Sequence, residues 1–169
     1  MKAAEQIRNA CEVCILAGGL GTRLGRDKSR LRLGGTSLIG HLRATASRAG
    51  LPIRVIRRDL VPRCGPMGGV YTALKTSRAA QVLFLSCDMP FVSERLLQDL
   101  LAQIEPTTPG LFVAQEGIVG FPFVLKTEAL RQVERLHARG RFSLQSLARN
   151  LKAQTLEPKL RHPGELMNV

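Results

Sequence analysis

The sequence predicts an α/β fold in which a mainly parallel sheet is covered by helices on both faces. Two observations support this prediction. Short apolar runs alternate with segments of helical periodicity along the chain, as in sheets built from strand–helix–strand units. The apolar runs are continuous, which indicates strands buried on both faces. The chain has 169 residues, 44% hydrophobic and 22% charged, with no repeat or linker, so we expect residues 1–169 to form a single domain.

The first half of the chain supplies three expected strands and two expected helices. The apolar run 11–17 ends in glycines, which is typical of a buried strand entering a loop. Segment 37–49 carries four apolar residues at helical spacing and is followed by Gly50, a plausible stop. We expect further strands at 51–56 and 81–86 and a second helix at 69–77.

The second half continues the alternation. Ser93 is placed as the N-cap of a helix that runs to about Ile104. We expect strands at 110–114 and 120–126, and helices at 127–138 and 143–151. Ligands of parallel sheets bind beyond the carboxyl ends of the strands. The candidate site therefore consists of three loops that follow strands, at 18–28, 59–69 and 87–91.

The net charge of +12 is concentrated in one part of the chain. Residues 1–63 hold 13 Lys and Arg against four acidic residues. Such a surplus indicates a polyanionic partner, either nucleic acid, an acidic membrane or a polyphosphate. Stacking on nucleic acid requires exposed aromatic rings, and the chain has no Trp, one Tyr and six Phe, most of them within apolar runs. Polyphosphate is favoured, and the alternative is an arginine excess that only solvates the surface.

Other features narrow the class of protein. No segment reaches the roughly 20 apolar residues of a membrane helix, and the first residues form no apolar signal core, so we expect a cytoplasmic protein without a membrane partner. Cys11 and Cys14 lack the second pair or the histidines that a zinc site requires, and we expect them to be buried as small apolar residues. The histidines, His41, His137 and His162, are expected to be structural or superficial.

The first candidate loop has the composition of a phosphate cradle. Residues 16–28 read LAGGLGTRLGRDK, in which four glycines let backbone amides approach a ligand and Arg23 and Lys28 supply positive charge. The loop is not a Walker motif, because no Gly-Lys-Ser/Thr follows at the required offset. A nicotinamide enzyme is also a poor fit, because no acidic residue follows before Asp59 to hold a ribose.

The other two loops each carry a carboxylate. Asp59 precedes a turn and the glycines at 65–69, where helix-start amides could accept an anion or let a base lie against the backbone. A plain tight turn explains that loop equally well. Asp88 stands at the tip of the strand at 81–86, where a carboxylate can hold a magnesium ion that bridges phosphate oxygens. Its alternative role is an N-cap or turn residue.

The three loops together resemble a known family. Residues 16–28, the GPMGG segment at 65–69 and the CDMPF segment at 87–91 are similar to the molybdenum cofactor guanylyltransferases. The GFPFV segment at 120–124, the GRFSL segment at 140–144 and the MNV segment at 167–169 extend the resemblance over nearly the whole chain.

The resemblance implies a Rossmann-like nucleotide-diphospho-sugar transferase fold and transfer of GMP from GTP to the terminal phosphate of molybdopterin, with release of pyrophosphate. GTP and molybdopterin or molybdenum cofactor would be substrates. Molybdopterin-loading proteins and acceptor molybdoenzymes would be protein partners, and nucleic acid would not. The residues implied are Arg23, Lys28 and Asp88 for catalysis, Leu16, Ala17, Gly18, Gly19, Lys28, Asp59, Gly65, Pro66 and Asp88 for the nucleotide, and Asp88 for Mg²⁺.

The sequence departs from the family pattern twice. The family has a strand ending in Asn after the first helix, whereas here Gly50 is followed directly by the segment that leads to Asp59. We therefore expect a smaller sheet, and guanine selectivity is open. The family also ends in Asn-x-Asn-Thr, whereas the sequence stops at Val169. Acceptor binding is then expected to be impaired or completed by another subunit.

Four other functions remain open. The protein could use CTP on the same pterin, act on another phosphorylated acceptor, or bind a nucleotide as a non-catalytic subunit. The last alternative is a nucleic-acid binder, whose affinity would fall steeply with salt.

Overall fold

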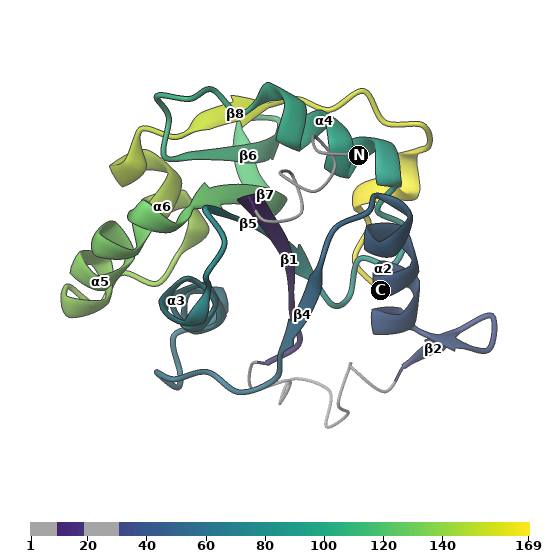
Figure 1. Cartoon of the computed structure of the whole chain (residues 1–169), viewed down its shortest axis with the longest axis horizontal. Coiled ribbons are helices and arrows are strands. Elements are labelled where there is room, and N and C mark those ends of the chain that lie inside the picture. The colour runs from purple at the N-terminus through teal and green to yellow at the C-terminus, as the bar shows by residue number, and fades with distance from the viewer. Residues whose placement is uncertain (1–9, 19–30) are drawn as a thin grey trace.

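The computed structural model describes residues 10–18 and 31–169, which fold around a six-stranded sheet (Figure 1). The strands lie in the order β4 (Ile53–Ile56), β1 (Cys11–Leu16), β5 (Gln81–Ser86), β7 (Ile118–Lys126), β6 (Gly110–Gln115) and β8 (Gln154–Leu156). β4, β1 and β5 are parallel to one another, as are β6 and β8. β7 is antiparallel to both of its neighbours, because a tight turn after Gln115 joins it to β6.

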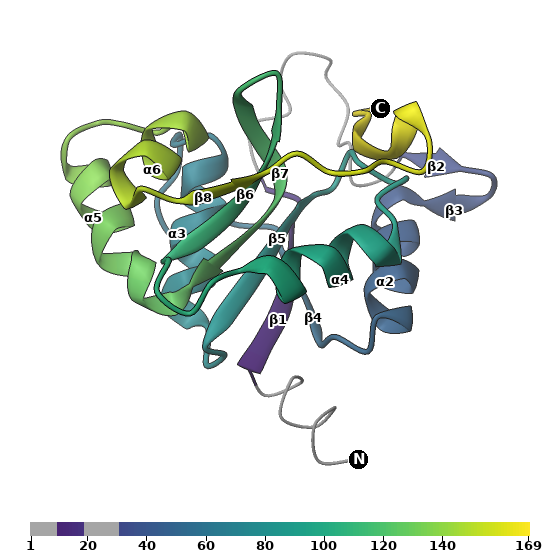
Figure 2. The same cartoon turned by 90° about the horizontal axis from the view of Figure 1, so that it is seen from above.

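Helices cover both faces of the sheet, as the sequence predicts. They are α2 (Leu38–Arg48), α3 (Pro66–Thr76), α4 (Glu94–Gln103), α5 (Leu130–Ala138) and α6 (Leu144–Leu151). Figures 1 and 2 show α3, α5 and α6 on one face and α2 with α4 on the other. Short 3₁₀ turns, η2 (Thr127–Ala129) and η3 (Pro163–Leu166), and a hairpin of β2 (Arg32–Leu33) with β3 (Thr36–Ser37) complete the described chain.

The core consists of two layers separated by the sheet. Successive side chains of a strand point to opposite faces. Val13 and Ile15 of β1 therefore pack toward α2 and α4, whereas Cys14 and Leu16 pack toward α3. β5 divides its residues in the same way, and its four central side chains are fully buried. This two-sided burial is the reason why the strands appear in the sequence as unbroken apolar runs.

Most element boundaries agree with the sequence-based expectations, and three need correction. Strand β4 begins at Ile53, two residues after the expected start at 51. Helix α3 begins at Pro66, three residues before the expected start at 69, because Gly65 adopts a φ of 54° and Pro66 occupies the first turn. Strand β7 begins at Ile118 instead of 120, directly after the turn that joins it to β6. The elements β2, β3, β8 and η3 were not expected; each has only two to four residues.

As the sequence predicts, no strand lies between α2 and β4. The structure describes residues 38–56 completely, and α2 is followed directly by β4, with Gly50 at φ 72° making the turn. β4 pairs with β1 on one side and ends the strand order on the other. β4 therefore lies next to β1, and Asp59, which follows β4, lies close to Gly18, which follows β1.

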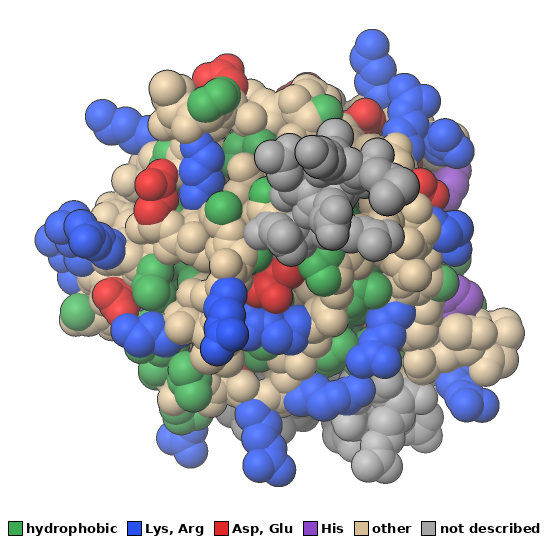
Figure 3. Space-filling model, in the orientation of Figure 1, with side chains coloured by type: hydrophobic (Ala, Val, Ile, Leu, Met, Phe, Trp, Pro, Cys, Tyr) green, Lys and Arg blue, Asp and Glu red, His purple; other side chains and the backbone are tan. Residues whose placement is uncertain are grey.

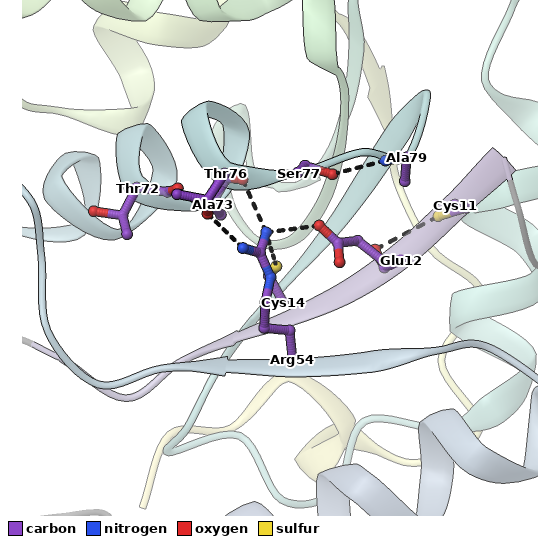
Figure 4. A network of polar contacts seen from close by, with 9 residues as sticks. All are labelled: Cys11, Glu12, Cys14, Arg54, Thr72, Ala73, Thr76, Ser77 and Ala79. Atoms are coloured by element: carbon purple, nitrogen blue, oxygen red, sulfur yellow. Dashed lines mark hydrogen bonds and ion pairs between the residues drawn. The ribbon is translucent and has the colours of Figure 1, made fainter.

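Arg54 of β4 forms hydrogen bonds with β1 and α3 (Figure 4). Its Nη2 donates to Glu12 Oε1 of β1 at 2.6 Å and to the Ala73 carbonyl of α3 at 2.9 Å. Its Nη1 donates to the Thr76 hydroxyl near the end of the same helix. One half-buried guanidinium therefore links β4, β1 and α3.

Candidate nucleotide-binding site

The three loops that were expected to form a site begin side by side at the carboxyl edge of β4, β1 and β5. Because these strands are parallel and adjacent, their following loops leave the sheet on the same side. Backbone hydrogen bonds join them: Ala17 N donates to the Ile56 carbonyl at 2.8 Å, and Cys87 N donates to the Leu16 carbonyl at 3.2 Å. The three loops expected to form a site are thus neighbours.

Asp59 lies between two glycines from the other parts of the site. A Cβ atom added to Gly18 would lie 3.1 Å from Asp59 Oδ1, and one added to Gly68 would lie 2.7 Å from Asp59 Oδ2. The Gly18 position would also approach the Arg57 carbonyl at 3.2 Å. Only residues without a side chain leave room for the carboxylate here. These contacts explain the glycines in both loops.

The Asp59 carboxylate has one oxygen atom without a hydrogen-bond donor. Oδ1 is buried and makes no hydrogen bond with the described residues. Loss of hydration raises the pKa of this carboxyl group above its usual range. Burial and the nearby Asp59 charge also raise the pKa of the Cys64 thiol. A buried acceptor without a donor is costly to the folded protein, and a ligand that supplies donors would offset that cost.

The first turn of α3 is packed against the end of β1. A Cβ atom added to Gly69 would lie 3.0 Å from Leu16 Cδ2, so this glycine lets helix and strand approach closely. The Thr72 hydroxyl donates to the Gly68 carbonyl at 2.8 Å and accepts from Leu60 N at 2.8 Å. The hydroxyl fixes the Asp59 loop to the helix. Gly65 and Pro66, both expected at the site, are exposed at the start of that helix.

Asp88 lies at the tip of β5 and is held by neighbouring groups. The Ser86 hydroxyl donates to Asp88 Oδ1 at 2.5 Å. The Asp88 carbonyl accepts from Val169 N at 2.9 Å, which ties the C-terminal segment to this loop. The same segment contains Glu165, whose side chain is 2% exposed and accepts a hydrogen bond from Arg161 N at 2.9 Å. These contacts fix the backbone on both sides of the carboxylate.

A cleft of about 770 Å³ opens beside Asp88. Asp88 and Pro66 face it together, so the second and third loops contribute to one cavity. Its remaining lining comes from Ser86, Met89, Gln115, Glu116, Ile118, Val119, Gly120, Phe121, Leu166 and Asn168. Sequence reasoning did not place the 115–118 turn at the site. The Glu116-Gly117 pair between two apolar runs was an available signal for a hairpin turn.

The structure describes some of the expected site residues, and others lie outside the described part of the chain. Gly18, Asp59 and Gly68 come together, as do Pro66 and Asp88. Leu16 is buried against Gly69, and Ala17 donates a backbone hydrogen bond, so these two residues shape the loop through packing and backbone. Gly19, Arg23 and Lys28 lie outside the described residues.

Cys11, Cys14 and His137 contact other parts of the fold. Cys11 and Cys14 are buried in β1, and burial raises the pKa of each thiol to about 12, so both are protonated at neutral pH. His137 contacts the Met67 carbonyl at 3.2 Å and lies beside the Tyr71 ring. Among residues 10–18 and 31–169, no group of three or more His, Cys, Asp or Glu side chains is placed to hold a metal ion. In the same residues no helix is long and apolar enough to cross a membrane.

The described residues form an α/β fold in which Gly18, Asp59 and Asp88 follow three adjacent parallel strands. The profile of the MobA-like NTP transferase domain family matches residues 13–155. A molybdenum cofactor guanylyltransferase from Pseudomonas putida is 31% identical over 89% of this chain and 88% of its own length. The chain therefore belongs to the MobA-like NTP transferase domain family and is a nucleotidyltransferase.

Solved structures agree on the fold. Molybdopterin-guanine dinucleotide biosynthesis protein A from Archaeoglobus fulgidus has a TM-score of 0.68 at 20% identity and covers 86% of this chain and 83% of its own. A 2-C-methyl-D-erythritol 4-phosphate cytidylyltransferase from Thermus thermophilus has a TM-score of 0.65 at 19% identity, covering 93% and 95%. A Mycobacterium tuberculosis protein crystallised with manganese has a TM-score of 0.59 at 16% identity, covering 88% of each.

Proposed function

We propose that this protein transfers GMP from GTP to the terminal phosphate of molybdopterin or of the molybdenum cofactor. A phosphate oxygen of the acceptor forms a bond to the α-phosphorus of GTP, the bond between that phosphorus and the bridging oxygen breaks, and pyrophosphate leaves. The products are a guanine dinucleotide cofactor and pyrophosphate. Residues 1–169 act in this proposal as one nucleotidyltransferase domain.

The buried Asp59 carboxylate between Gly18 and Gly68 is the observation that carries the proposal. Guanine presents two adjacent donors, N1–H and the N2 amino group, which match the two oxygens of one carboxylate. Cytosine and adenine present a single amino donor beside a ring acceptor, which would repel the second oxygen. A guanine base therefore satisfies Asp59 best, and the glycines let the base approach the backbone.

The phosphates of GTP bind to the loop after β1 and, through Mg²⁺, to Asp88 in this proposal. Backbone amides at Gly18 and Gly19, with Arg23 and Lys28, are proposed to hold the triphosphate. Asp88 is proposed to hold Mg²⁺, and the site fits that ion, because magnesium prefers carboxylate oxygens and commonly binds one or two carboxylates together with substrate phosphates. Bound magnesium would offset charge on the reacting phosphates. The protein groups themselves position the substrates and stabilise charge, which is what nucleotidyl transfer requires.

The cleft of about 770 Å³ suits the acceptor. It lies on the Asp88 side of the site, where the acceptor phosphate must approach the α-phosphorus. Its wall combines apolar side chains, such as Ile118 and Phe121, with the polar Gln115 and Asn168. A planar heterocycle with polar edges matches such a lining.

Product analysis tests the proposal directly. The purified protein is incubated with Mg²⁺, molybdopterin and GTP, and mass spectrometry searches for the guanine dinucleotide. We expect the product with the wild type, loss of at least a hundredfold in rate with Asp88→Ala, and little change with Asp99→Ala, a matched control in an exposed ion pair on α4. An unchanged rate with Asp88→Ala would remove Asp88 from the mechanism. GTP binding without any product would favour a non-catalytic subunit or a different acceptor.

A further inference from the structure

A second cavity, outside the nucleotide site, lies between α2 and the start of α4. It has a volume of about 540 Å³, which is within the range of roughly 300–1,000 Å³ typical of small-molecule sites. Figures 1 and 2 show α2 and α4 side by side, with the C-terminal segment next to them. We call it the α2–α4 cavity; its lining includes His41, Arg48, Phe91, Glu94, Arg95 and Arg161.

The α2–α4 cavity shares no residue with the cleft beside Asp88. Met89 faces the cleft, whereas Pro90, Phe91 and Val92 face the α2–α4 cavity. The loop after β5 thus separates the two. A ligand in one cavity does not have to displace a ligand in the other.

Three arginines give the α2–α4 cavity its charge. Arg48 and Arg95 each lie near one carboxylate, at 3.8 Å from Glu94 and 3.7 Å from Asp99, and both side chains are more than half exposed. Arg48 Nη2 also donates to the Thr45 hydroxyl at 3.2 Å. Both ion pairs are longer than a good hydrogen bond, so each guanidinium group keeps further donors for another partner. Arg161 also lines the cavity, and its backbone N donates to Glu165. Glu94 is the one acidic residue in the lining, so the cavity carries a surplus of positive charge.

The remaining wall is apolar. Pro90, Phe91 and Val92 form one side, and the Phe91 ring meets the His162 ring edge-on at 6.3 Å between centroids. A bare counter-ion would leave this wall in contact with water. A ligand with both an anionic and an apolar part would cover the wall and the arginines together.

We propose that the α2–α4 cavity binds a phosphorylated small molecule whose phosphate contacts Arg48 and Arg161 and whose apolar part lies against Phe91. Guanidinium groups suit this task, because their planar arrangement of donors matches phosphate oxygens. The proposal does not depend on the reaction proposed above.

Amide NMR of the full chain tests the proposal, with adenosine monophosphate as the probe. The titration is performed without GTP, so that shifts in the Asp59 and Asp88 loops and shifts at the α2–α4 cavity are followed separately, and is repeated with adenosine, which lacks the phosphate. We expect saturable shifts at Thr45, Arg48 and Glu94, much weaker shifts with adenosine, and an affinity about tenfold lower in Arg161→Ala. Arg131→Ala, an exposed arginine of α5, is the control and should bind like the wild type.

Three results would overturn the proposal. Shifts that sodium sulfate reproduces at the same ionic strength would show only ion accumulation around arginines. Shifts confined to the Asp59 and Asp88 loops would place the probe in the nucleotide site. Equal affinity in Arg161→Ala, with unchanged thermal unfolding, would exclude the phosphate contact.

Discussion

Asp59 is half-buried beside two glycines, and in the proposed function its carboxylate binds the guanine base. The contacts with Gly18 and Gly68 leave no room for a side chain, and Oδ1 is without a donor among the described residues. The raised pKa has the same origin, since burial penalises the charged form. At the scale of single residues, the proposal therefore predicts that Asp59 lowers the stability of the unliganded protein and raises its affinity for GTP.

The variant Asp59→Asn should separate the effect of Asp59 on stability from its effect on GTP binding. A group whose pKa is higher in the folded than in the unfolded protein destabilises the fold as pH rises through that pKa. Without nucleotide, the wild type should be less stable than Asp59→Asn at pH 7, by about one or two degrees in melting temperature, since much of the side chain remains near solvent. The gap should close as pH falls to the ordinary aspartate range, near 3.8. GTP binding should weaken at least tenfold in the variant.

Thermal unfolding across pH and calorimetric GTP binding measure both effects. Asp99→Asn is the matched control, because its carboxylate is exposed and paired with Arg95. A variant that bound GTP as tightly as the wild type would show that Asp59 does not contact the nucleotide.

At the residue scale, the sequence predicted that Asp59 and Asp88 lie beyond the ends of strands but not how they are held. Asp59 and Asp88 were predictable because each follows an apolar run and therefore lies beyond the carboxyl end of a strand. The contact of Asp59 with Gly68 and the support of Asp88 by Ser86 depend on how α3 and β5 pack, which no local pattern encodes. Val169, which binds the Asp88 backbone, is 81 positions away in the sequence.

At the scale of elements, strand β4 leads into the Asp59 loop. Arg54 links this strand to β1 and α3. In Arg54→Met, the Glu12 carboxylate and the Ala73 carbonyl lose their donor. We expect the free energy of unfolding to fall by about 2 kcal/mol, since the pair is partly buried and charge-assisted. Denaturant unfolding measures the loss.

A double-mutant cycle tests whether the loss comes from the Glu12 pair. Arg54→Met combined with Glu12→Leu should be more stable than the sum of the two single changes predicts, with a coupling of about 1–2 kcal/mol. Arg131→Met, on the exposed surface of α5, should change stability by less than about 0.5 kcal/mol. Strict additivity of the two changes at β4 would contradict the role assigned to Arg54.

The segment around η3 positions the Asp88 loop through Glu165. The Glu165 side chain closes the turn by accepting from Arg161 N, and the chain then brings Asn168 to the cleft and Val169 to the Asp88 carbonyl. In Glu165→Ala we expect the KM for molybdopterin to rise about tenfold while GTP affinity is kept. Glu165→Gln should restore most of the KM, because its amide oxygen can accept the same hydrogen bond. Equal KM values in wild type and Glu165→Ala, from steady-state kinetics, would rule out this positioning role.

Elements with a strong sequence pattern were predictable, and short ones were not. The run 81–86 and the Ser93 N-cap match β5 and the start of α4, because buried strands and capped helices leave local signals. The strands β2, β3 and β8 have two or three residues each, too few for any periodicity. The reversal of β7 depends on pairing between strands, which the alternation of strands and helices alone does not define.

For the molecule as a whole, charge and fold favour the same class of ligand. The net charge is +12, and Figure 3 shows Lys and Arg side chains spread over the visible face with few acidic ones. Arg57, Arg58 and Arg63 are exposed in the loop that carries Asp59. A positive surface of this kind would attract the triphosphate of the proposed substrate to the carboxyl edge of the sheet. The fold supplies the loops, and the surface charge raises the local concentration of the ligand.

The loss of one strand makes base selection the most direct test of the whole account. The purified chain is mixed with Mg²⁺ and molybdopterin, and pyrophosphate release is followed with GTP, CTP or ATP in parallel. We predict release with GTP at a rate at least a hundredfold above that with CTP or ATP, because only guanine offers two donors to Asp59. Release with CTP and not with GTP would contradict the guanine assignment and make the protein a cytidylyltransferase.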